Sequence, residues 1–583
     1  MLKNYKGNLK KMSEQLNISE ILCRILVNRG IVDLERCTSF IKPELSRLHN
    51  PRLMKDLEKG VGIIKTNISR SMKILVIGDY DVDGVISTYL LYTALKRCGA
   101  DVEYEIPHRT KDGYGINTSI IENAKSKGIN TIITCDNGIS AIEQIKYAKD
   151  LGLTVIITDH HQIPFIEGVK GERIYVKPDA DAIINPKQIE CNYPFKELCG
   201  SGVAFKFIDV LYEKMGIPKE ELNKLIEYVA IATVCDVVDM VDENRILVKN
   251  GLELINNTDN IGLRALIKET GIEGKKITAY SFGFIIGPCI NASGRLDSAK
   301  KGVKLLLSKN ENEAKELAEG LSALNRERKD MTVIGTADVE MIIEKTNMNN
   351  DKVFVIYKSG IHESIAGIIA GRIKDKYHRP TFVLTTAEVG VKGSGRSIDN
   401  YNMFEELIKC KDILIRFGGH PMAAGLSLEE LNIDVLRTRL NKLTLLSEED
   451  LIPKVYIDMQ LSLESITLEL ANDIEKLEPF GKANPKPLFA EKNVKVMKMM
   501  KLGKNKNVLK LVLITNSGNK LEGIYFNDIL EFEEFIKNKF GEVELYNVLN
   551  GRSNNIKLDI IFNIDINEYM GNKSVQLVIK HYR

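Results

Sequence analysis

The sequence lacks several features that would have narrowed its class at once. Its 583 residues include no tryptophan, and its nine cysteines are odd in number and never spaced C-x-x-C. This pattern excludes a disulfide framework or a zinc knuckle and favours reduced thiols in a cytosolic compartment. No segment approaches the ~18 consecutive apolar residues of a membrane span, and no apolar core of a signal peptide follows the basic start MLKNYKGNLKKMSEQ. We therefore expect a cytoplasmic protein that does not enter a membrane.

The sequence also lacks an excess of charge of one sign. It contains 81 lysine and arginine residues against 79 aspartate and glutamate residues, which gives a net charge of +2. This balance excludes a protein that is basic over its whole surface, so any charge that binds nucleic acid must be local. No G-x-x-x-x-G-K-[ST] motif occurs, which argues against an ATP-driven motor. At ~150 residues per domain, the length predicts about four domains.

Short β-branched segments alternate with helical patterns in the region that follows residue 70. KILVIG, TIITC and TVIIT are typical of buried strands, and segments of helical length separate them. Strands that alternate with helices of about 12 residues predict right-handed crossovers and an open parallel sheet.

Later regions differ from this pattern. Residues 311–345 have many charges and few helix breakers, which predicts a long connecting helix, and a second α/β pattern begins at KVFVIY (352–357). From about residue 454, short apolar runs predict a small barrel or sandwich. We predict a multidomain α/β fold with a leader packed on the core (1–70), a parallel-sheet catalytic domain (71–310), the connecting helix (311–345), a smaller α/β domain (346–450) and a β-rich domain (451–583).

Acidic side chains follow three of the predicted strands. KILVIG leads into Asp79, Asp81 and Asp83, TIITC leads into Asp136, TVIIT leads into Asp159, His160 and His161, and Asp236 follows the helical segment IEYVAIATV. Since chemistry in open α/β sheets collects at the carboxyl ends of the strands, we expect these residues at one edge. A solvated turn could explain a single acidic motif, but a sheet edge has no packing use for three in succession.

So many carboxylates repel one another and raise one another's pKa values unless cations lie among them. Carboxylate and imidazole ligands favour Mn²⁺ or Mg²⁺ over the thiolate sites of structural zinc. Two such ions can activate a water molecule and stabilise the leaving oxygen of a phosphoryl transfer. The D-x-D-x-D-G pattern also opens an EF-hand loop, but its twelfth position here is Leu90 instead of glutamate, and a strand precedes it.

At this point the motifs carry a resemblance. DYDVDG, CDNG, DHH at 159–161 and the aspartate of ATVCD resemble the four motifs of the DHH phosphoesterase superfamily, and RFGGHPMAAGL (416–426) resembles the signature of its DHH-associated domain. IPHRTKDGYGIN, INASGRL, LNRER, GSGRSIDN and LEPFGKANPKP narrow the resemblance to the RecJ exonuclease family, over nearly the whole chain. The β-rich end resembles the OB-fold of that family.

The resemblance implies an activity and partners. It implies a metal-dependent exonuclease that hydrolyses single-stranded DNA from 5′ to 3′ and releases 5′-mononucleotides in recombination and repair. It also implies cooperation with a single-strand-binding protein and a RecQ-type helicase.

The resemblance further implies roles for single residues. The matched metal-ligand positions are Asp79, Asp81, Asp83, Asp136, His160 and Asp236, with Asp136 as the bridging ligand. His161 would touch the scissile phosphate, and Asp159 would orient a ligand. Arg109 and Arg295 match positions that contact phosphate.

Two glycine-rich segments, 393–400 and 418–425, are predicted to be loops whose backbone N–H groups approach an anion. A glycine pair alone is more often a tight turn than a phosphate site. A guanidinium binds phosphate bidentately, so Arg396 strengthens the prediction. The complete set of predicted phosphate- or DNA-binding residues is Arg109, Arg295, Arg396, Ser397, Gly418, Gly419 and His420.

A local excess of positive charge lies near the start of the β-rich domain. Residues 481–510 contain nine lysines and one glutamate, a local charge of +8. The ordinary explanation is a solvated lysine-rich face. Phe489, Tyr525 and Phe526 in the same domain are available for stacking on bases, which shifts the interpretation toward single-strand binding.

Three residues depart from the family pattern. Cys289 stands where arginine is expected, Ala483 where glycine is expected, and Thr332 where an acid is expected. We expect altered affinity or processivity, with the chemistry retained.

Two alternatives stay open. The first is a DHH phosphodiesterase of nanoRNA or cyclic dinucleotides, against which the lysine-rich β domain argues. The second is a non-catalytic single-strand-binding scaffold, which would be expected to lose metal ligands, and this chain has all of them.

Overall fold

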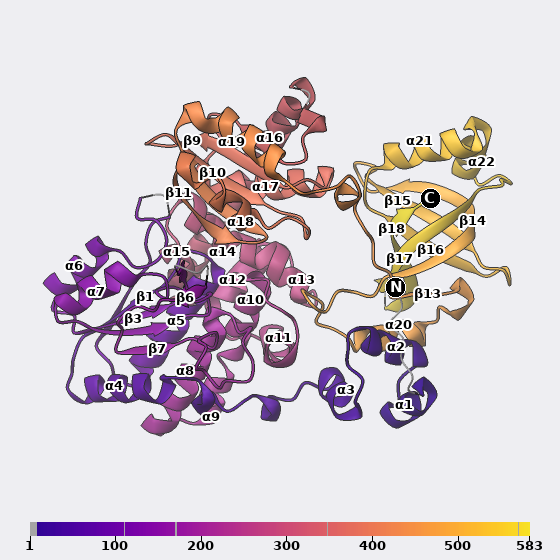
Figure 1. The fold of residues 1–583 in the computed structure, drawn as a ribbon. Coiled ribbons are helices and arrows are strands. Elements are labelled where there is room, and N and C mark those ends of the chain that lie inside the picture. Colours follow the sequence, from indigo (N-terminus) through magenta and orange to yellow (C-terminus); the bar gives the residue numbers. More distant parts are fainter. Residues whose placement is uncertain (1–7, 110, 169–171, 347, 570) are drawn as a thin grey trace. The chain divides into compact units, whose positions relative to one another are not determined.

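The computed structural model describes residues 8–109, 111–168, 172–346, 348–569 and 571–583. The chain forms two compact units (Figure 1). The barrel unit contains the chain up to Leu48, Asp239–Lys249 and Val455–Arg583, and the two-sheet unit contains His49–Val238 and Asn250–Lys454. The basic start at residues 1–7 and residue 110 of IPHRTKDGYGIN lie outside the described residues.

The first sheet of the two-sheet unit is parallel, as the sequence predicts. Its order is β2-β1-β3-β4-β7, with β1 Ile74–Ile77, β2 Val102–Glu105, β3 Thr131–Cys135, β4 Thr154–Thr158 and β7 Ala182–Ile184. The three acidic motifs follow β1, β3 and β4, which are neighbours in this order. The strand order reverses direction between β1 and β3, which is where open α/β sheets place their ligands.

Helices cover both faces of this sheet. On one face, α6 (Thr118–Ser126) and α7 (Ile142–Asp150) share a buried apolar cluster with alternate residues of β1, β3 and β4. On the other, α5 (Val82–Arg97) and α8 (Gly200–Met215) pack on the strands and on each other. Asn117 caps α6 by accepting the N–H of Ile120.

The remaining elements of this part are short. The helices are α4 Leu57–Ser69, α9 Lys219–Asn223, α10 Ile226–Cys235, α12 Ile261–Glu269, α13 Ala279–Ser281, the π-helix Phe282–Ile286, α14 Gly287–Leu296 and α15 Lys300–Leu307. The helix α11 (Asp242–Ile255) belongs to the barrel unit up to Lys249 and to the two-sheet unit from Asn250. A two-stranded antiparallel sheet pairs β5 Phe165–Glu167 with β6 Arg173–Tyr175.

A helix of 35 residues, α16 (Glu311–Lys345), leads to the second sheet and matches the predicted connecting helix. The order is β11-β12-β10-β9-β8, with β8 Phe354–Tyr357, β9 Thr381–Thr386, β10 Val391–Arg396, β11 Leu414–His420 and β12 Ala423–Leu428. Only the pair of β8 and β9 is parallel among the described strands of this sheet. The helices α17 Glu363–Tyr377, α18 Met403–Ile408 and α19 Ile433–Leu443 accompany it.

The prediction that both glycine-rich segments are loops is wrong for most of their length. Gly393 and Gly395 lie inside β10, and Gly418–His420 lies at the end of β11, which turns back into β12. Packing explains these glycines, because a Cβ on Gly393 would stand 2.1 Å from the Leu384 side chain and one on Gly395 2.4 Å from the Met403 sulfur. Glycine at these two positions leaves room for the side chains of Leu384 and Met403 to approach the backbone of β10.

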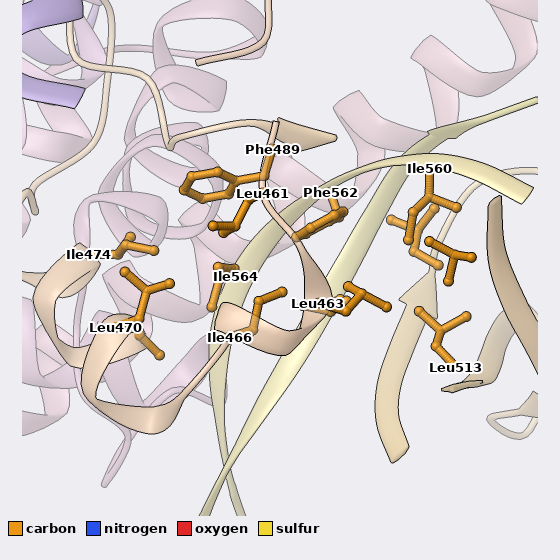
Figure 2. Packing of buried hydrophobic residues seen from close by; sticks show 14 of the residues in the cluster. Leu461, Leu463, Ile466, Leu470, Ile474, Phe489, Leu513, Ile560, Phe562 and Ile564 are labelled. Atoms are coloured by element: carbon orange, nitrogen blue, oxygen red, sulfur yellow. The ribbon is translucent and has the colours of Figure 1, made fainter. Parts of the chain in front are cut away.

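The β-rich end is a small closed barrel. Its order is β13-β14-β15-β16-β18-β17, and a further pairing of β14 with β17 closes the ring. The strands are β13 Met459–Gln460, β14 Phe489–Leu502, β15 Val508–Ile514, β16 Lys520–Tyr525, β17 Lys557–Tyr569 and β18 Asn572–Tyr582, with helices α20 Leu468–Glu475, α21 Ile529–Phe540 and α22 Glu542–Leu549. Figure 2 shows Phe489, Phe562 and Ile564 of the strands in the same buried cluster as Leu470 and Ile474 of α20.

The N-terminal helices share this core. Leu22, Ile25 and Leu26 of α2 (Glu20–Asn28) and Phe40 of α3 (Leu34–Ile41) are buried in one cluster with the barrel residues, and α1 (Leu9–Leu16) adds Met12. The predicted leader 1–70 is thus divided: its first helices pack on the barrel, and α4 belongs to the two-sheet unit. The apolar stripes of these helices face strands made more than 400 residues later in the chain, a contact that local sequence patterns do not reveal.

A buried arginine joins three segments of the barrel unit. The Arg245 side chain is 1% exposed, and it donates hydrogen bonds to the backbone carbonyls of Phe40, Lys476, Leu477, Glu478 and Pro479. Its guanidinium also lies 3.9 Å from the centre of the Phe40 ring. The motif LEPFGKANPKP therefore forms a socket for Arg245.

Among the described residues, no helix combines the length and the apolar character that crossing a membrane would require.

Candidate metal centre and phosphate-binding residues

The first acidic motif turns directly from β1 into α5. Asp79 follows the strand, and Asp81 caps the helix by accepting the N–H of Gly84 at 3.0 Å. The turn is so tight that a Cβ on Gly84 would stand 2.4 Å from the Asp79 carbonyl oxygen. The spacing D-x-D-x-D-G is therefore what places carboxylates on both sides of this turn.

Asp83 is held by the beginning of another helix. Its carboxylate accepts the backbone N–H groups of Gly200 at 2.6 Å and Ser201 at 2.8 Å, at the N-terminus of α8. A helix N-terminus favours an anion because its first N–H groups are free and the helix dipole is positive there. Gly200 is also pressed against the cluster, since a Cβ on it would stand 2.7 Å from that of Asp136. Sequence reasoning missed this contribution, although small residues in CGSG before an apolar helix are a usable signal.

Asp136 has a strained backbone. Its φ is +60°, in the left-handed region that a non-glycine residue adopts at a cost of about 1–3 kcal/mol. The strain is held in place from both sides: Asp136 N–H donates to the Thr158 carbonyl at 3.0 Å, and the Asn137 amide donates to the carbonyls of Ile77 and Cys135. The motif C-D-N-G thus fixes one carboxylate between β1, β3 and β4.

Asp159 orients its neighbours and has both oxygens occupied. One oxygen accepts the N–H groups of His160 and His161 and lies 2.7 Å from Nδ1 of His161, and the other accepts the N–H of Ile139. Desolvation favours a neutral His161 ring, but the charge and hydrogen bond of Asp159 outweigh it and raise the pKa of His161 to about 9. Asp159 therefore positions His161, whose Nδ1 lies 4.0 Å from Oδ1 of Asp136.

The structure brings the predicted ligands together in overlapping groups. Ligand atoms lie within 4.8 Å of one another in three sets: Asp79, Asp81 and Asp136; Asp83, His160 and Asp236; and Asp136, His160 and His161. Asp136 and His160 each belong to two sets, and their Oδ1 and Nε2 atoms are 3.1 Å apart. This overlap suits two ions that share Asp136.

The electrostatics of the cluster call for cations. Burial, together with repulsion from neighbouring carboxylates, raises the pKa values of Asp79, Asp136 and Asp236 well above the usual range of an aspartate. Burial also lowers the pKa of His160 to about 4, so its ring is neutral and able to bind a metal. Within the described part of the chain, Asp79 Oδ1 and both ring nitrogens of His160 are buried without a hydrogen bond. Buried polar atoms are normally paired, so these atoms fit hard divalent cations such as Mn²⁺ or Mg²⁺.

Arginines gather beside the carboxylates. Arg109 stacks over the Tyr80 ring at 4.7 Å, and Arg295 donates to the Ser364 carbonyl at 2.6 Å. Burial and repulsion from Arg109, Arg328 and Arg396 lower the pKa of Arg295 to about 9. Among the described residues, no carboxylate forms an ion pair with any of the four arginines, which are Arg109, Arg295, Arg328 and Arg396. Arginines that repel one another and have no carboxylate at ion-pair distance indicate a place for an anion.

Sequence reasoning missed two neighbours of this site. Arg328, from the LNRER motif of α16, adds a further positive charge, and the Tyr114 hydroxyl donates to the Asp136 carbonyl at 2.9 Å and lies 3.3 Å from the His161 ring nitrogens. Arg328 belongs to the motif LNRER and Tyr114 to IPHRTKDGYGIN, but neither motif by itself predicts which residue these side chains contact.

A cavity of about 330 Å³ lies between the two sheets of the unit, and Tyr80 and Tyr114 line it together with Arg109. The second sheet contributes Lys392, Gly393, Ser394, Arg416, Phe417, Gly425, Leu426 and Ser427. Of the predicted phosphate-binding residues, only Arg109 lines this cavity among the described residues. Ser397 is buried and donates to the Tyr401 carbonyl, and His420 Nδ1 accepts the N–H of Met422.

None of the three departures stands at a proposed ligand position. Cys289 is buried between α14 and α16, where its sulfur accepts a hydrogen bond from Asn325. Thr332 is buried within α16 and donates to the Arg328 carbonyl. Ala483 has a φ of +61°, which explains why glycine is expected there.

This fold and site define a metal-dependent phosphoesterase of the DHH class. The models of the DHH family N-terminal domain, the DHHA1 domain and the RecJ OB domain match residues 73–233, 350–444 and 457–581. The single-stranded-DNA-specific exonuclease RecJ of Bacillus subtilis (strain 168) is 37% identical over 579 residues, which cover 99% of this chain and 69% of the relative. The chain belongs to the RecJ family.

Other relatives and solved structures agree. The RecJ exonucleases of Salmonella typhimurium and Escherichia coli K12 are each 33% identical, over 97% and 96% of this chain and 96% and 95% of their own lengths. The crystal structure of Thermus thermophilus RecJ with Mn²⁺ covers all of this chain and 78% of that chain with a TM-score of 0.79 at 24% identity, so it supports the fold. A manganese-bound exonuclease RecJ has a TM-score of 0.57 at 30% identity, over 67% of this chain and 94% of that one.

Proposed function

We propose that this protein is a single-stranded-DNA-specific exonuclease that hydrolyses phosphodiester bonds with two Mn²⁺ or Mg²⁺ ions. It acts from 5′ to 3′ and releases 5′-mononucleotides, in DNA recombination and repair. The observation that carries the proposal is the set of three overlapping ligand groups around Asp136 and His160, at the carboxyl edge of a parallel sheet. The direction and the products rest on the resemblance of the whole chain to the RecJ family.

The ligands proposed for the ions are Asp79, Asp81, Asp83, Asp136, His160 and Asp236. Ions held there would lower the pKa of a bound water molecule and neutralise charge on the phosphate. The protein's own part is to hold these carboxylates in place before any substrate arrives. Backbone N–H groups of α5 and α8 fix Asp81 and Asp83, and the left-handed turn fixes Asp136.

Side chains around the ligands would position the strand. Asp159 holds the His161 ring beside Asp136, where it can donate to an oxygen of the scissile phosphate. Arg109, Arg295 and Arg396 repel one another and form no ion pair with a carboxylate of the described residues, so they supply charge that can hold phosphates of the DNA strand. Ser397, directly after β10, and Gly418, Gly419 and His420, at the end of β11, stay in the proposal as residues that adjoin the DNA backbone.

The barrel unit supports a polynucleotide substrate over a dinucleotide. The barrel carries the lysine-rich segment 481–510, whose β14–β15 turn is exposed. Of the aromatic residues considered from the sequence, Phe526 is 57% exposed, whereas Phe489 and Tyr525 are buried. Phe526 is therefore the one of these three that can stack on a base.

Cooperation with a single-strand-binding protein and a RecQ-type helicase belongs to the proposal by family resemblance, as does action in the cytoplasm. Free thiols at nine cysteines support a reducing compartment.

The decisive experiment is digestion of a long single strand labelled at its 5′ or 3′ end, with Mn²⁺ or with EDTA, beside a matched duplex. We expect early release of the 5′ label as mononucleotide, only with metal and only from the single strand. Asp136→Ala should abolish release, and Asp150→Ala, at an exposed position at the end of α7, should not. Tight binding without cleavage would favour the scaffold, and cleavage confined to very short oligonucleotides would favour the small-substrate phosphodiesterase.

A further inference from the structure

Two aromatic side chains stand exposed on the two-sheet unit and stack on each other. Tyr280 of α13 is 64% exposed and Phe284 of the π-helix is 65% exposed. Their ring centres are 4.7 Å apart and their planes differ by 21°, which is a stacked arrangement. We call Tyr280 and Phe284 the aromatic pair. Large apolar rings that are held together in water, away from any core, need a reason beyond packing.

The backbone beneath the aromatic pair is fixed. Phe282, between the two rings in sequence, is completely buried, and its carbonyl accepts a hydrogen bond from the Cys235 sulfur at 3.4 Å. Gly287 also presses on this sulfur, since a Cβ there would stand 2.3 Å away. The segment Phe282–Ile286 is a π-helix, a rare form found most often at functional sites. The aromatic pair is therefore presented by a rigid support.

This support adjoins the metal centre. Cys235 is the last residue of α10, and the next residue, Asp236, belongs to the proposed ligand set. A hydrogen bond and a tight glycine contact thus link the element that carries the aromatic pair to the residue beside a ligand. Bases of a strand held at the carboxylates are therefore the candidates for contact with this element.

The charge near the aromatic pair suits a polyanion. Lys275 and Lys276 are exposed a few residues before Tyr280, and they outnumber Glu273, the one carboxylate of the loop 271–278. Cations that flank flat, exposed rings are the combination with which proteins bind single strands without reading their sequence.

We propose that the aromatic pair is a stacking platform for unpaired bases of the single-stranded substrate, next to the metal centre. This inference rests on the proposed function and names the residues that hold bases, where the site described above holds phosphates. The platform favours single-stranded over double-stranded DNA, because the bases of a duplex are already stacked and do not offer their faces.

The absence of tryptophan gives a direct test. In the full chain with EDTA, Phe284→Trp places a single indole at the platform. We expect its fluorescence to be quenched when an oligothymidine strand binds and to change little with an abasic strand of equal length, which has the phosphates but no bases. Equal quenching by both strands, or none by either while both bind, would overturn the platform.

Affinity gives a second test that does not depend on the probe. Replacing both rings, Tyr280→Ala with Phe284→Ala, should weaken binding of the oligothymidine strand about tenfold or more and leave binding of the abasic strand unchanged. Tyr280→Phe should keep the affinity. Val333→Ala with Ile334→Ala, two exposed apolar residues of α16, is the matched control and should also keep it.

The outcomes separate the platform from the proposed function. If the double alanine variant folds with an unchanged melting temperature and binds both strands like the parent, the platform is wrong, whatever the nuclease assay shows. If the parent binds strands in a base-dependent way but cleaves none with Mn²⁺, the platform stands and the exonuclease proposal fails.

Discussion

The two units bury charge in opposite ways. In the barrel unit, Arg245 is buried with hydrogen bonds to five backbone carbonyls and a ring face against its guanidinium. In the two-sheet unit, Asp79 and His160 are buried with polar atoms that no other described residue satisfies, and Asp136 sits in a strained conformation. Backbone carbonyls of the protein thus solvate the charge of Arg245, whereas the acidic cluster keeps polar atoms without hydrogen-bond partners.

The difference shows how a structural charge can be told from a functional one. A buried group is costly unless it is paired, so a protein that leaves several unpaired in one place has another partner for them. Arg245 needs nothing further and joins three segments of chain. The carboxylates need cations. Backbone strain such as that of Asp136 is expected at a site of chemistry.

The largest effect is expected at Asp136 in the acidic cluster. Asp136→Ala removes a carboxylate shared by two ligand sets and should lower kcat by about 10²–10³-fold or more, because ion-held stabilisation of the transition state is worth several kcal/mol. Without metal, the same variant should be no less stable than the parent, since it loses a buried carboxylate that its neighbours repel. Single-strand digestion and thermal unfolding in EDTA measure the two effects. A variant that loses stability and activity together would break the comparison.

The second largest effect is expected at Arg245, whose hydrogen bonds are all made within the barrel unit. Arg245→Met leaves several carbonyls without a donor and should lower the free energy of unfolding of the barrel unit by about 3 kcal/mol or more. Hydrogen exchange of the β14–β18 amides measures it. Arg552→Met, at an exposed arginine that lies over the Tyr546 ring, is the control and should have little effect. Equal protection in both variants would show that the socket is not structural.

Metal should act on one unit alone. Adding Mn²⁺ at about 100 times its Kd should stabilise the two-sheet unit by about 2.7 kcal/mol, because the ion binds only the folded state. Slower hydrogen exchange in α5 and α8, with no change in β14–β18, is the expected result. Asp136→Ala should remove the protection. Protection that spreads equally over the barrel would mean that the ions bind elsewhere as well.

The smallest effect is expected at Ala483 in the barrel unit. Ala483→Gly should stabilise it by about 0.5–1 kcal/mol, because relief of the left-handed strain exceeds the entropy that glycine adds to the unfolded chain. Denaturant unfolding followed by barrel-specific exchange measures it. Ala471→Gly, in the helix α20, should have the opposite sign. If both substitutions destabilise, Ala483 is not strained.

Much of the fold follows from the sequence because its signals are local. Strands β1, β3 and β4 and the helix 311–345 can be predicted from residue types, spacing and length. The acidic cluster follows as well, since parallel strands must bring their carboxyl ends together.

The rest depends on contacts between distant segments. Nothing near Ser201 in the sequence shows that its N–H meets Asp83, and nothing near Leu22 shows that it packs on the barrel. The glycine pattern of β10 predicts a loop, whereas the structure has a strand in which the side chain of Leu384 on the neighbouring strand leaves no room for a Cβ at Gly393. Patterns within one segment report its own conformation and not the partner that it will meet.

The composition of the barrel unit from three stretches of chain has a consequence for synthesis. On a ribosome, the helices α1–α3 emerge about 400 residues before the strands that bury them, a delay of roughly 20–80 s at about 5–20 residues per second. During that interval the apolar faces of Leu22, Ile25 and Leu26 are without their final cover. The nascent chain is therefore most exposed to aggregation and to chaperones at its beginning, and a circular permutant that places these helices after β18 would abolish the wait.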